Sequence, residues 1–160
     1  MKNKVEKKVA VVSKCLLGYR CRFDGEIRNY GIKEMLNKRN YEVVGVCPEL
    51  EIGLGVPREP IRLVLKGKRI LLIQKKTQMK LKRKLERFSK DFLSRLKRID
   101  VFVLKSKSPS CGNNDCKVFS NLKDEIVVGF SDGVFTKVCK RFFPGVYIFN
   151  EENIFSLDIL

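Results

Sequence analysis

Short apolar runs recur along the chain, and turn-forming residues end each of them. Three of these runs are rich in β-branched residues: Val9–Val12, Glu42–Val46 and Val101–Leu104. A continuous apolar run of this length is typical of a strand that is buried on both faces of a parallel sheet. Two later runs, Ile126–Gly129 and Gly145–Phe149, predict a fourth and a fifth strand.

Helical periodicity appears between these runs. Five apolar residues recur at spacings of three and four and predict a helix from about Gln78 to Arg98, with Thr77 as its N-cap. They are Leu81, Leu85, Phe88, Phe92 and Leu96. A short helix is expected near Tyr30 to Lys38, and another from Val134 to Phe143, where Pro144 and Gly145 follow.

The alternation of strands and helices predicts an α/β fold, with an open, mainly parallel sheet flanked by helices in a Rossmann-like arrangement. Residues 61–73 alternate around a turn at Lys66–Lys68 and predict a small β-hairpin. We expect residues 1–160 to form one domain, because 44% hydrophobic residues supply enough material for a single core.

The longest apolar stretch, Ile70–Ile73, is only strand-sized, and the charged N-terminus lacks a signal-peptide pattern. We therefore expect a cytoplasmic protein with no membrane partner, and its oligomeric state is left open.

Positive charge is concentrated in one segment. Between Arg62 and Arg98 the chain has fifteen Lys/Arg residues against two acidic ones, within a formal net charge of +16 for the whole chain. Such an excess favours a polyanionic partner such as RNA, bound through segment 62–98. The alternative is a solvated basic helix, because net charge also serves solubility.

The chain has no histidine and six cysteines. The absence of imidazole excludes histidine-containing triads and histidine metal ligands. In a cytoplasmic chain, cysteines are expected to serve as reduced thiols, metal ligands or catalysts rather than as a disulfide framework.

Three of the cysteines, Cys15, Cys47 and Cys111, each follow one of the three β-branched strands. Because ligands bind outside the carboxyl ends of parallel strands, we expect these cysteines to converge on one crevice. Three thiolates can hold a cubane iron–sulfur cluster and leave one iron without a protein ligand. The alternatives are buried structural cysteines, or a closed four-cysteine zinc site that uses Cys21 or Cys116. The remaining cysteine, Cys139, falls in an apolar helical stretch and is expected in the core.

Polar residues on the same loops are candidates for the chemistry. Glu49 lies two residues after Cys47 and is a candidate proton donor or acceptor. Ser108 and Ser110 precede Cys111 and can hydrogen-bond a substrate heteroatom, or merely form a turn. Arg58 places a cation on the second loop, where it can hold an anionic or carbonyl-rich substrate.

Several segments are similar to motifs of one known family. They are Val12–Gly18, Cys21–Gly25, Cys47–Glu49, Gly53–Leu54, Pro57–Pro60 and Leu104–Gly112. Through them the chain resembles the DUF523 family, whose characterised members are thiouracil desulfurases, over nearly its whole length. Departures occur at Ile52–Gly53, where the family usually has paired glycines, and at Ser131–Phe135, where it usually has Gly-x-Gly-Val-Thr.

The resemblance implies an enzyme that carries an oxygen-sensitive [4Fe-4S] cluster on Cys15, Cys47 and Cys111. Such a desulfidase replaces the sulfur of a thiolated pyrimidine, as nucleobase or nucleoside, by oxygen from water and releases hydrogen sulfide. By position, Glu49 and Ser108 match catalytic roles. Ser110, Arg58 and Asp24 are assigned to substrate binding. The alternatives that the residues alone leave open are a basic RNA-binding module and a zinc protein with structural cysteines.

Overall fold

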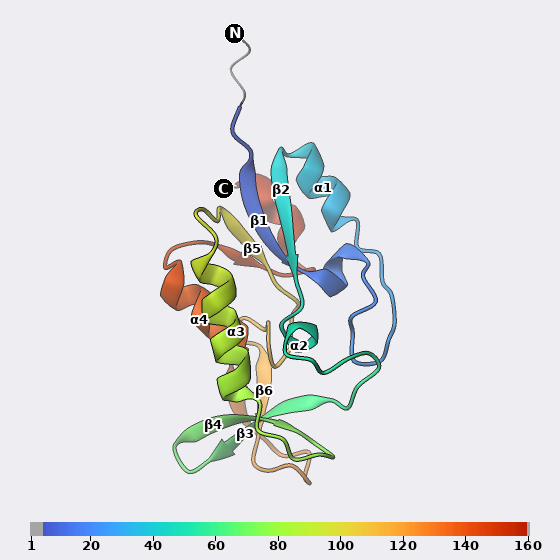
Figure 1. Cartoon of the computed structure of the whole chain (residues 1–160), viewed down its shortest axis with the longest axis vertical. Coiled ribbons are helices and arrows are strands. Elements are labelled where there is room, and N and C mark those ends of the chain that lie inside the picture. The colour runs from blue at the N-terminus through green and yellow to red at the C-terminus, as the bar shows by residue number, and fades with distance from the viewer. Residues whose placement is uncertain (1–4, 160) are drawn as a thin grey trace.

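The computed structural model describes residues 5–159, and of their side chains those of residues 5–157. It contains two four-stranded sheets that lie toward opposite ends of an elongated molecule (Figure 1). The mixed α/β class predicted from the sequence is confirmed, and the second sheet is larger than the hairpin that was expected.

The first sheet is entirely parallel. It contains β1 (Lys8–Ser13), β2 (Tyr41–Val46), β5 (Val101–Val103) and β8 (Ile148–Phe149), in the order β2-β1-β5-β8. From β1 the chain first adds β2 on one side and later adds β5 on the other. The strand order therefore reverses between β1 and β5, which is the place where open α/β sheets bind their ligands.

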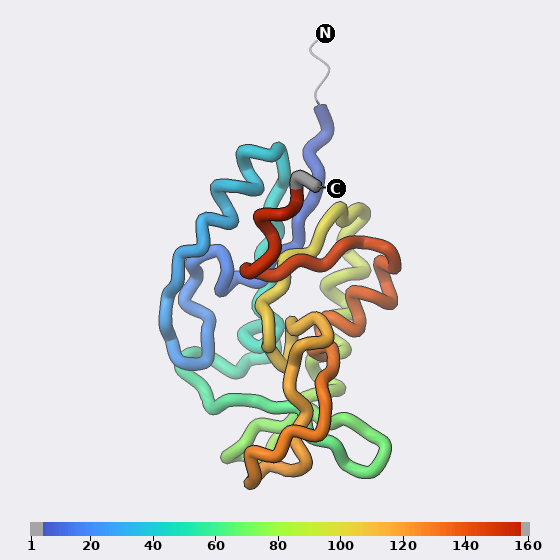
Figure 2. The backbone as a smooth tube through the Cα atoms, turned by 180° about the vertical axis from the view of Figure 1, so that it is seen from behind, coloured from blue at the N-terminus to red at the C-terminus, as the bar shows by residue number. Residues whose placement is uncertain are grey.

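Both faces of this sheet are covered, which is why its strands are apolar without alternation. Val11 and Phe102 face a core cluster with α3 (Lys82–Ser94) and α4 (Val134–Phe142), and both strand residues are fully buried. Ala10 and Val103 face the opposite cluster with α1 (Ile32–Lys38) and η2 (Ile154–Ile159). In Figure 2 the C-terminal segment returns to the end of the molecule where β1 begins.

The second sheet is mixed and has the order β4-β3-β6-β7. The predicted hairpin is present as β3 (Ile61–Lys66) and β4 (Arg69–Gln74), and β6 (Cys116–Phe119) pairs with β3 in parallel. The run at 126–129, expected in the parallel sheet, instead forms β7 (Val127–Ser131), antiparallel to β6. The sequence did not reveal β6 because the strand has only four residues and one of them is an exposed lysine.

The long helix starts later than predicted. It begins at Lys82 after the N-cap Leu81, which makes no side-chain cap bond, and Gln78 has a positive φ of 56°. Thr77 therefore does not cap the helix, and its hydroxyl donates to Gln74 Oε1 at 2.7 Å. Within residues 5–159, none of the helices is both long enough and apolar enough to cross a bilayer.

Candidate active site

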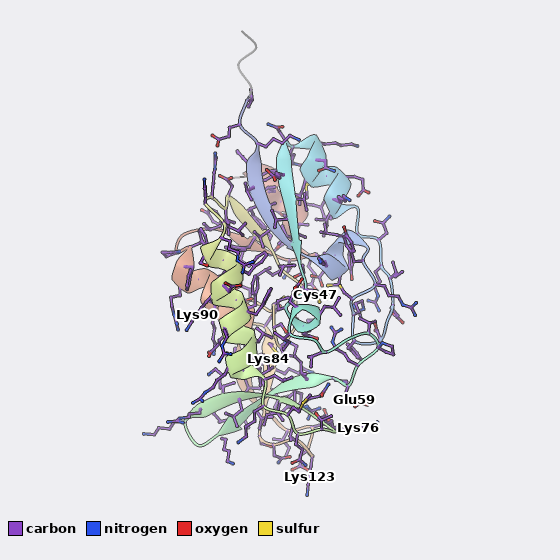
Figure 3. All side chains as sticks on the ribbon, viewed as in Figure 1. Cys47, Glu59, Lys76, Lys84, Lys90 and Lys123 are labelled. Carbon is purple, nitrogen blue, oxygen red and sulfur yellow. The ribbon has the colours of Figure 1, made fainter. Side chains whose placement is uncertain are left out.

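A cavity of about 240 Å³ lies at the carboxyl ends of β1, β2 and β5. Its lining comes from four segments that are distant in sequence: Ser13–Cys15, Cys21–Phe23, Val46–Glu49 with Arg58, and Lys105–Cys111. Cys47, labelled in Figure 3, lies between the two sheets. The cavity therefore occupies the point at which the strand order reverses.

Four of the six cysteines line this cavity. Cys15 lies in η1 (Lys14–Leu17) directly after β1, Cys47 follows β2, and Cys111 lies in the loop after β5. Their convergence is the arrangement expected from the strand order. Cys21 joins them in the lining, whereas Cys116 and Cys139 are buried elsewhere.

Hydrogen bonds separate these thiols into two kinds. The Cys47 thiol donates to the Cys21 carbonyl oxygen at 3.8 Å. Interaction with the Cys21 thiol lowers the pKa of Cys15 and that of Cys47, the latter to about 7. The bond to Cys15 raises the pKa of Cys21 itself. Burial raises the pKa of Cys111, and it raises that of Cys116 to about 12. Cys15 and Cys47 are thus the thiols most readily available as thiolates.

The spacing of the thiols bears on what they can hold. Sulfurs around one tetrahedral zinc ion must lie about 3.8 Å apart, as the Zn–S bond length requires. Over residues 5–159, no three His, Cys, Asp or Glu side chains are grouped closely enough for a single ion. Cysteine thiolates are the usual protein ligands of iron–sulfur clusters. The four cysteines in the lining therefore fit the expected cluster by the chemistry of their side chains.

Among the described residues, Glu49 is the only carboxylate in the cavity lining. It lies in the short helix α2 (Pro48–Glu51), where a proline at the first position follows Cys47. Its Oε2 accepts from Arg58 Nε at 2.8 Å and from Nη2 at 2.7 Å, and its Oε1 accepts from Ser110 Oγ at 2.7 Å. Only 4% of the Arg58 side chain and 13% of the Glu49 side chain are exposed. The carboxylate is therefore held rigidly, with both oxygens acting as acceptors.

Arg58 and Ser110 are committed to protein partners. Beyond Glu49, the guanidinium donates to the carbonyl oxygens of Gly55 and Cys21, each at 2.8 Å. The single hydroxyl hydrogen of Ser110 goes to Glu49. Both residues hold Glu49 and line the cavity, and their expected contacts with the substrate stay a prediction.

Ser108 differs from Ser110 in that its hydroxyl hydrogen is not already donated to a protein acceptor. Its Oγ accepts the backbone N–H groups of Ser110, at 3.2 Å, and of Cys111, at 3.1 Å. A serine hydroxyl also has one hydrogen to donate, and for Ser108 that hydrogen has no acceptor in the part of the chain whose side chains are described, residues 5–157. Ser108 is therefore the serine that can donate to a molecule in the cavity.

Asp24 lies outside the cavity lining, although it was expected to touch the substrate. Its carboxylate binds Arg22, with Nε–Oδ1 at 3.2 Å and Nη2–Oδ2 at 3.1 Å, and accepts the N–H of Glu26. Arg22 itself lines the cavity. The contact of Asp24 with the site therefore runs through Arg22.

The N-terminus of α4 fixes the loop that carries Cys111. The N–H groups of Gly133, Val134 and Phe135 donate to carbonyl oxygens of the loop at 2.8–3.0 Å. A Cβ on Gly133 would lie 2.3 Å from the carbonyl carbon of Ser110, so only glycine fits there. Sequence reasoning noted this segment only as a departure from a motif, because the contact joins positions far apart in the chain.

A family model and a solved structure match this chain. A search of curated proteins finds no match. A solved structure described as a [4Fe-4S]-dependent thiouracil desulfidase, TudS, has the same fold, with a TM-score of 0.68 and 21% identity over 97% of this chain and 100% of that one. The sequence model of the 2-thiouracil desulfurase family matches residues 10–152. The chain therefore belongs to the 2-thiouracil desulfurase family, as its motifs indicated.

Proposed function

We propose that this protein is an iron–sulfur-dependent desulfidase that converts a thiolated pyrimidine, of the thiouracil or thiouridine type, to its oxo form. The observation that carries the proposal is that Cys15, Cys47, Cys111 and Glu49 line one cavity at the reversal of strand order. Family membership and the fold of TudS, itself described as a [4Fe-4S]-dependent thiouracil desulfidase, support it.

Cys15, Cys47 and Cys111 would hold a [4Fe-4S] cluster through their thiolates. When bound, such a cluster supplies one iron without a protein ligand, a Lewis acid that can bind the sulfur of the substrate. Cys21 would remain a thiol, whose single S–H can donate to one of these two ligands, Cys15 or Cys47, at a time.

The residues of the chain supply the proton transfers. Ser108 donates its hydroxyl hydrogen to a ring heteroatom and orients the base. Glu49 accepts a proton from water as the oxygen adds to the thiocarbonyl carbon and returns that proton to the departing sulfur, and the second proton of the water passes from the new hydroxyl to the sulfur by the same route as C=O forms. One water is consumed, the C=S bond becomes C=O, and hydrogen sulfide leaves with no net oxidation. Arg58 and Ser110 keep the carboxylate of Glu49 in place throughout.

Anaerobic purification with iron and sulfide analysis tests the cofactor first. A broad absorption near about 400 nm with about four irons per chain, followed by sulfide release from 2-thiouracil, is the expected result. A protein that stays colourless and iron-free after anaerobic reconstitution would refute the proposal, and bound zinc would favour a structural role for the cysteines.

Two broader properties accompany this function. We expect residues 1–160 to work as one domain, because a single core cluster joins Val11 of the parallel sheet to Leu63 of the second sheet. We also propose a cytoplasmic location, which the six free thiols support.

Segment 62–98 suggests a second partner, and we propose that it binds RNA. Thirteen of its fifteen Lys/Arg side chains are exposed. Lys84 and Lys90 lie on α3, and Lys76 and Lys123 lie at the end of the molecule that holds the second sheet (Figure 3). There a groove with an apolar floor, including Val64, Leu71 and Ile73, is bordered by five lysines: Lys66, Lys75, Lys76, Lys80 and Lys123. Basic borders around an apolar floor suit a single strand, with phosphates on the lysines and bases on the floor.

Three of these lysines, Lys66, Lys80 and Lys123, have no acidic partner among the described side chains, those of residues 5–157. Replacing all three with Gln should reduce the slope of log affinity for single-stranded RNA against log salt by about 2, since each phosphate contact contributes about 0.7. The matched control replaces Lys33, Lys38 and Lys137, which are exposed elsewhere. Equal slopes for the two triple variants would refute the RNA site.

A further inference from the structure

Residues that follow three parallel strands meet beside the cavity. Lys105 and Ser106 come soon after β5, Ser13 ends β1, and Glu151 follows β8. The Lys105 N–H donates to Ser13 Oγ at 3.0 Å. The Glu151 carboxylate binds both residues of the β5 loop, and its side chain is only 10% exposed.

The Lys105 ammonium has no hydrogen left for a substrate. A lysine ammonium carries three N–H donors, and three acceptors surround this one. They are Glu151 Oε1, the Ser106 carbonyl oxygen at 3.3 Å and Ser106 Oγ at 3.2 Å. Lys105 lines the cavity but serves to hold Glu151 rather than to donate a proton.

Glu151 in turn fixes the backbone. Its Oε2 accepts the N–H of Ser106 at 3.0 Å, and its Oε1 accepts the Ser106 hydroxyl at 2.6 Å. The loop is fixed a second time at Ser108. Its Oγ accepts two backbone N–H groups, and its carbonyl oxygen accepts the backbone N–H of Gly112. The loop is thus held firmly on both sides of a single residue.

That residue, Lys107, has a left-handed backbone conformation, with φ of 59°. A lysine rarely adopts this conformation, and strained residues persist only where their surroundings impose them. Lys107 is exposed, lines the cavity, and has no acidic partner among the side chains of residues 5–157. Its conformation is therefore imposed by the anchors at Ser106 and Ser108, and the first of these depends on Glu151.

We propose that Glu151 is a positioning residue of the active site. By binding Lys105 and Ser106 it keeps Lys107 in the left-handed conformation and thereby holds the Ser108 hydroxyl toward the cavity. The inference rests on the proposed function in that Ser108 donates to the thiolated base. Loss of Glu151 would let Lys107 relax to a right-handed or extended conformation and would turn Ser108 away.

The test uses the full chain, purified anaerobically, and compares Glu151→Gln with Glu152→Gln, whose side chain is exposed. Glu151→Gln should raise amide exchange at Ser106 and Ser110 by about tenfold or more, since it weakens hydrogen bonds to a charged group. It should also lower kcat about tenfold with a smaller change in KM, as expected for an interaction that matters in the transition state. Adding Lys107→Asn to Glu151→Gln should restore both the slow amide exchange and kcat, because asparagine tolerates the left-handed conformation.

Equal exchange in the two single variants would overturn the proposal. So would faster exchange in Glu151→Gln that Lys107→Asn does not reverse, because Glu151 would then act on the loop without acting on Lys107. Exchange is measured without substrate, so a protein that desulfurates nothing would refute the proposed function while the exchange comparison still decides the role of Glu151.

Discussion

Ser110 donates its hydroxyl hydrogen to Glu49 over 2.7 Å, although 61 positions separate the two residues. The bond joins the loop after β2 to the loop after β5, and each loop also carries a cysteine of the cavity. The distance between Cys47 and Cys111 is therefore coupled to the position of the carboxylate. The proposed base and two of the proposed cluster ligands form one rigid unit.

Glu49→Gln is expected to lower kcat by about 10²–10⁴, the usual contribution of a general acid–base group. The chromophore should remain, because the amide oxygen can accept from Arg58 while its NH₂ group donates to Ser110 Oγ. Absorbance near 400 nm and sulfide release measure the two effects on one sample. Glu51→Gln, in the same short helix but more exposed, should change neither; a similar loss of turnover there would contradict the role of Glu49.

Arg58→Met should destabilise the fold strongly. It leaves the carboxylate of Glu49 without its cationic partner, and removing one partner of a buried ion pair costs about 3–5 kcal/mol. The free energy of unfolding in urea measures this cost, and adding Glu49→Gln should recover part of it. Arg28→Met is the control, because its pair with Glu26 is about half exposed on both sides and should contribute about 0–1 kcal/mol. Comparable losses in the two variants would show that burial of the Arg58 pair is unimportant.

The strands that carry the site could be predicted because their signals are local. Uniform apolar runs before Cys15, Cys47 and Cys111 indicated buried parallel strands. Because ligands bind outside the carboxyl ends of such strands, the three thiols were expected to converge there. The strand β6 could not be predicted, because four residues with an exposed lysine carry no periodic signal. Its position is set by pairing with β3 and β7.

The roles of polar residues were harder to predict than their presence. Arg58 and Ser110 were correctly expected near the site but were assigned to the substrate. Both donate hydrogen bonds to Glu49, and Arg58 donates also to Gly55 and Cys21, contacts that join positions far apart or irregularly spaced and that the sequence does not display. Glu151 was missed entirely, because a glutamate after a two-residue strand looks like any surface carboxylate until Lys105 and Ser106 are seen beside it.

Cys21→Ser is expected to retain the chromophore, whereas Cys15→Ala, Cys47→Ala and Cys111→Ala should each abolish it. Metal ligands bind as thiolates, whereas the Cys21 S–H lowers the pKa of Cys15 and of Cys47 as a neutral donor that can serve one of them at a time. A serine hydroxyl can replace that donor. Iron content and absorbance of the four anaerobically purified variants measure the outcome; loss of iron in Cys21→Ser would make Cys21 a ligand, and full retention in any alanine variant would remove that cysteine from the ligand set.

Gly133→Ala should loosen the loop of Cys111. The added methyl would lie within 2.5 Å of three backbone atoms of Ser110 and Cys111, so the loop must move. Overpacking of this kind costs about 1–3 kcal/mol, and iron content should fall with it. Gly129→Ala is the matched control, because its Cβ meets no atom within 4 Å. If both variants unfold at the same urea concentration with equal iron, the contact does not constrain the loop.

The stabilising effect of Glu151 should depend on pH. Burial would raise the pKa of this carboxyl, but hydrogen bonds from Lys105 and Ser106 outweigh that effect and lower it. A carboxyl whose pKa is lower in the folded than in the unfolded state contributes stability that is present above its unfolded pKa of about 4.3 and is lost as pH falls through the folded value. The difference in unfolding free energy between the wild type and Glu151→Gln should therefore be constant from about pH 6 to 8 and shrink below about pH 4. Urea titrations across this range measure it, and a difference that grows on acidification would mean that the ionised carboxylate is not the stabilising form.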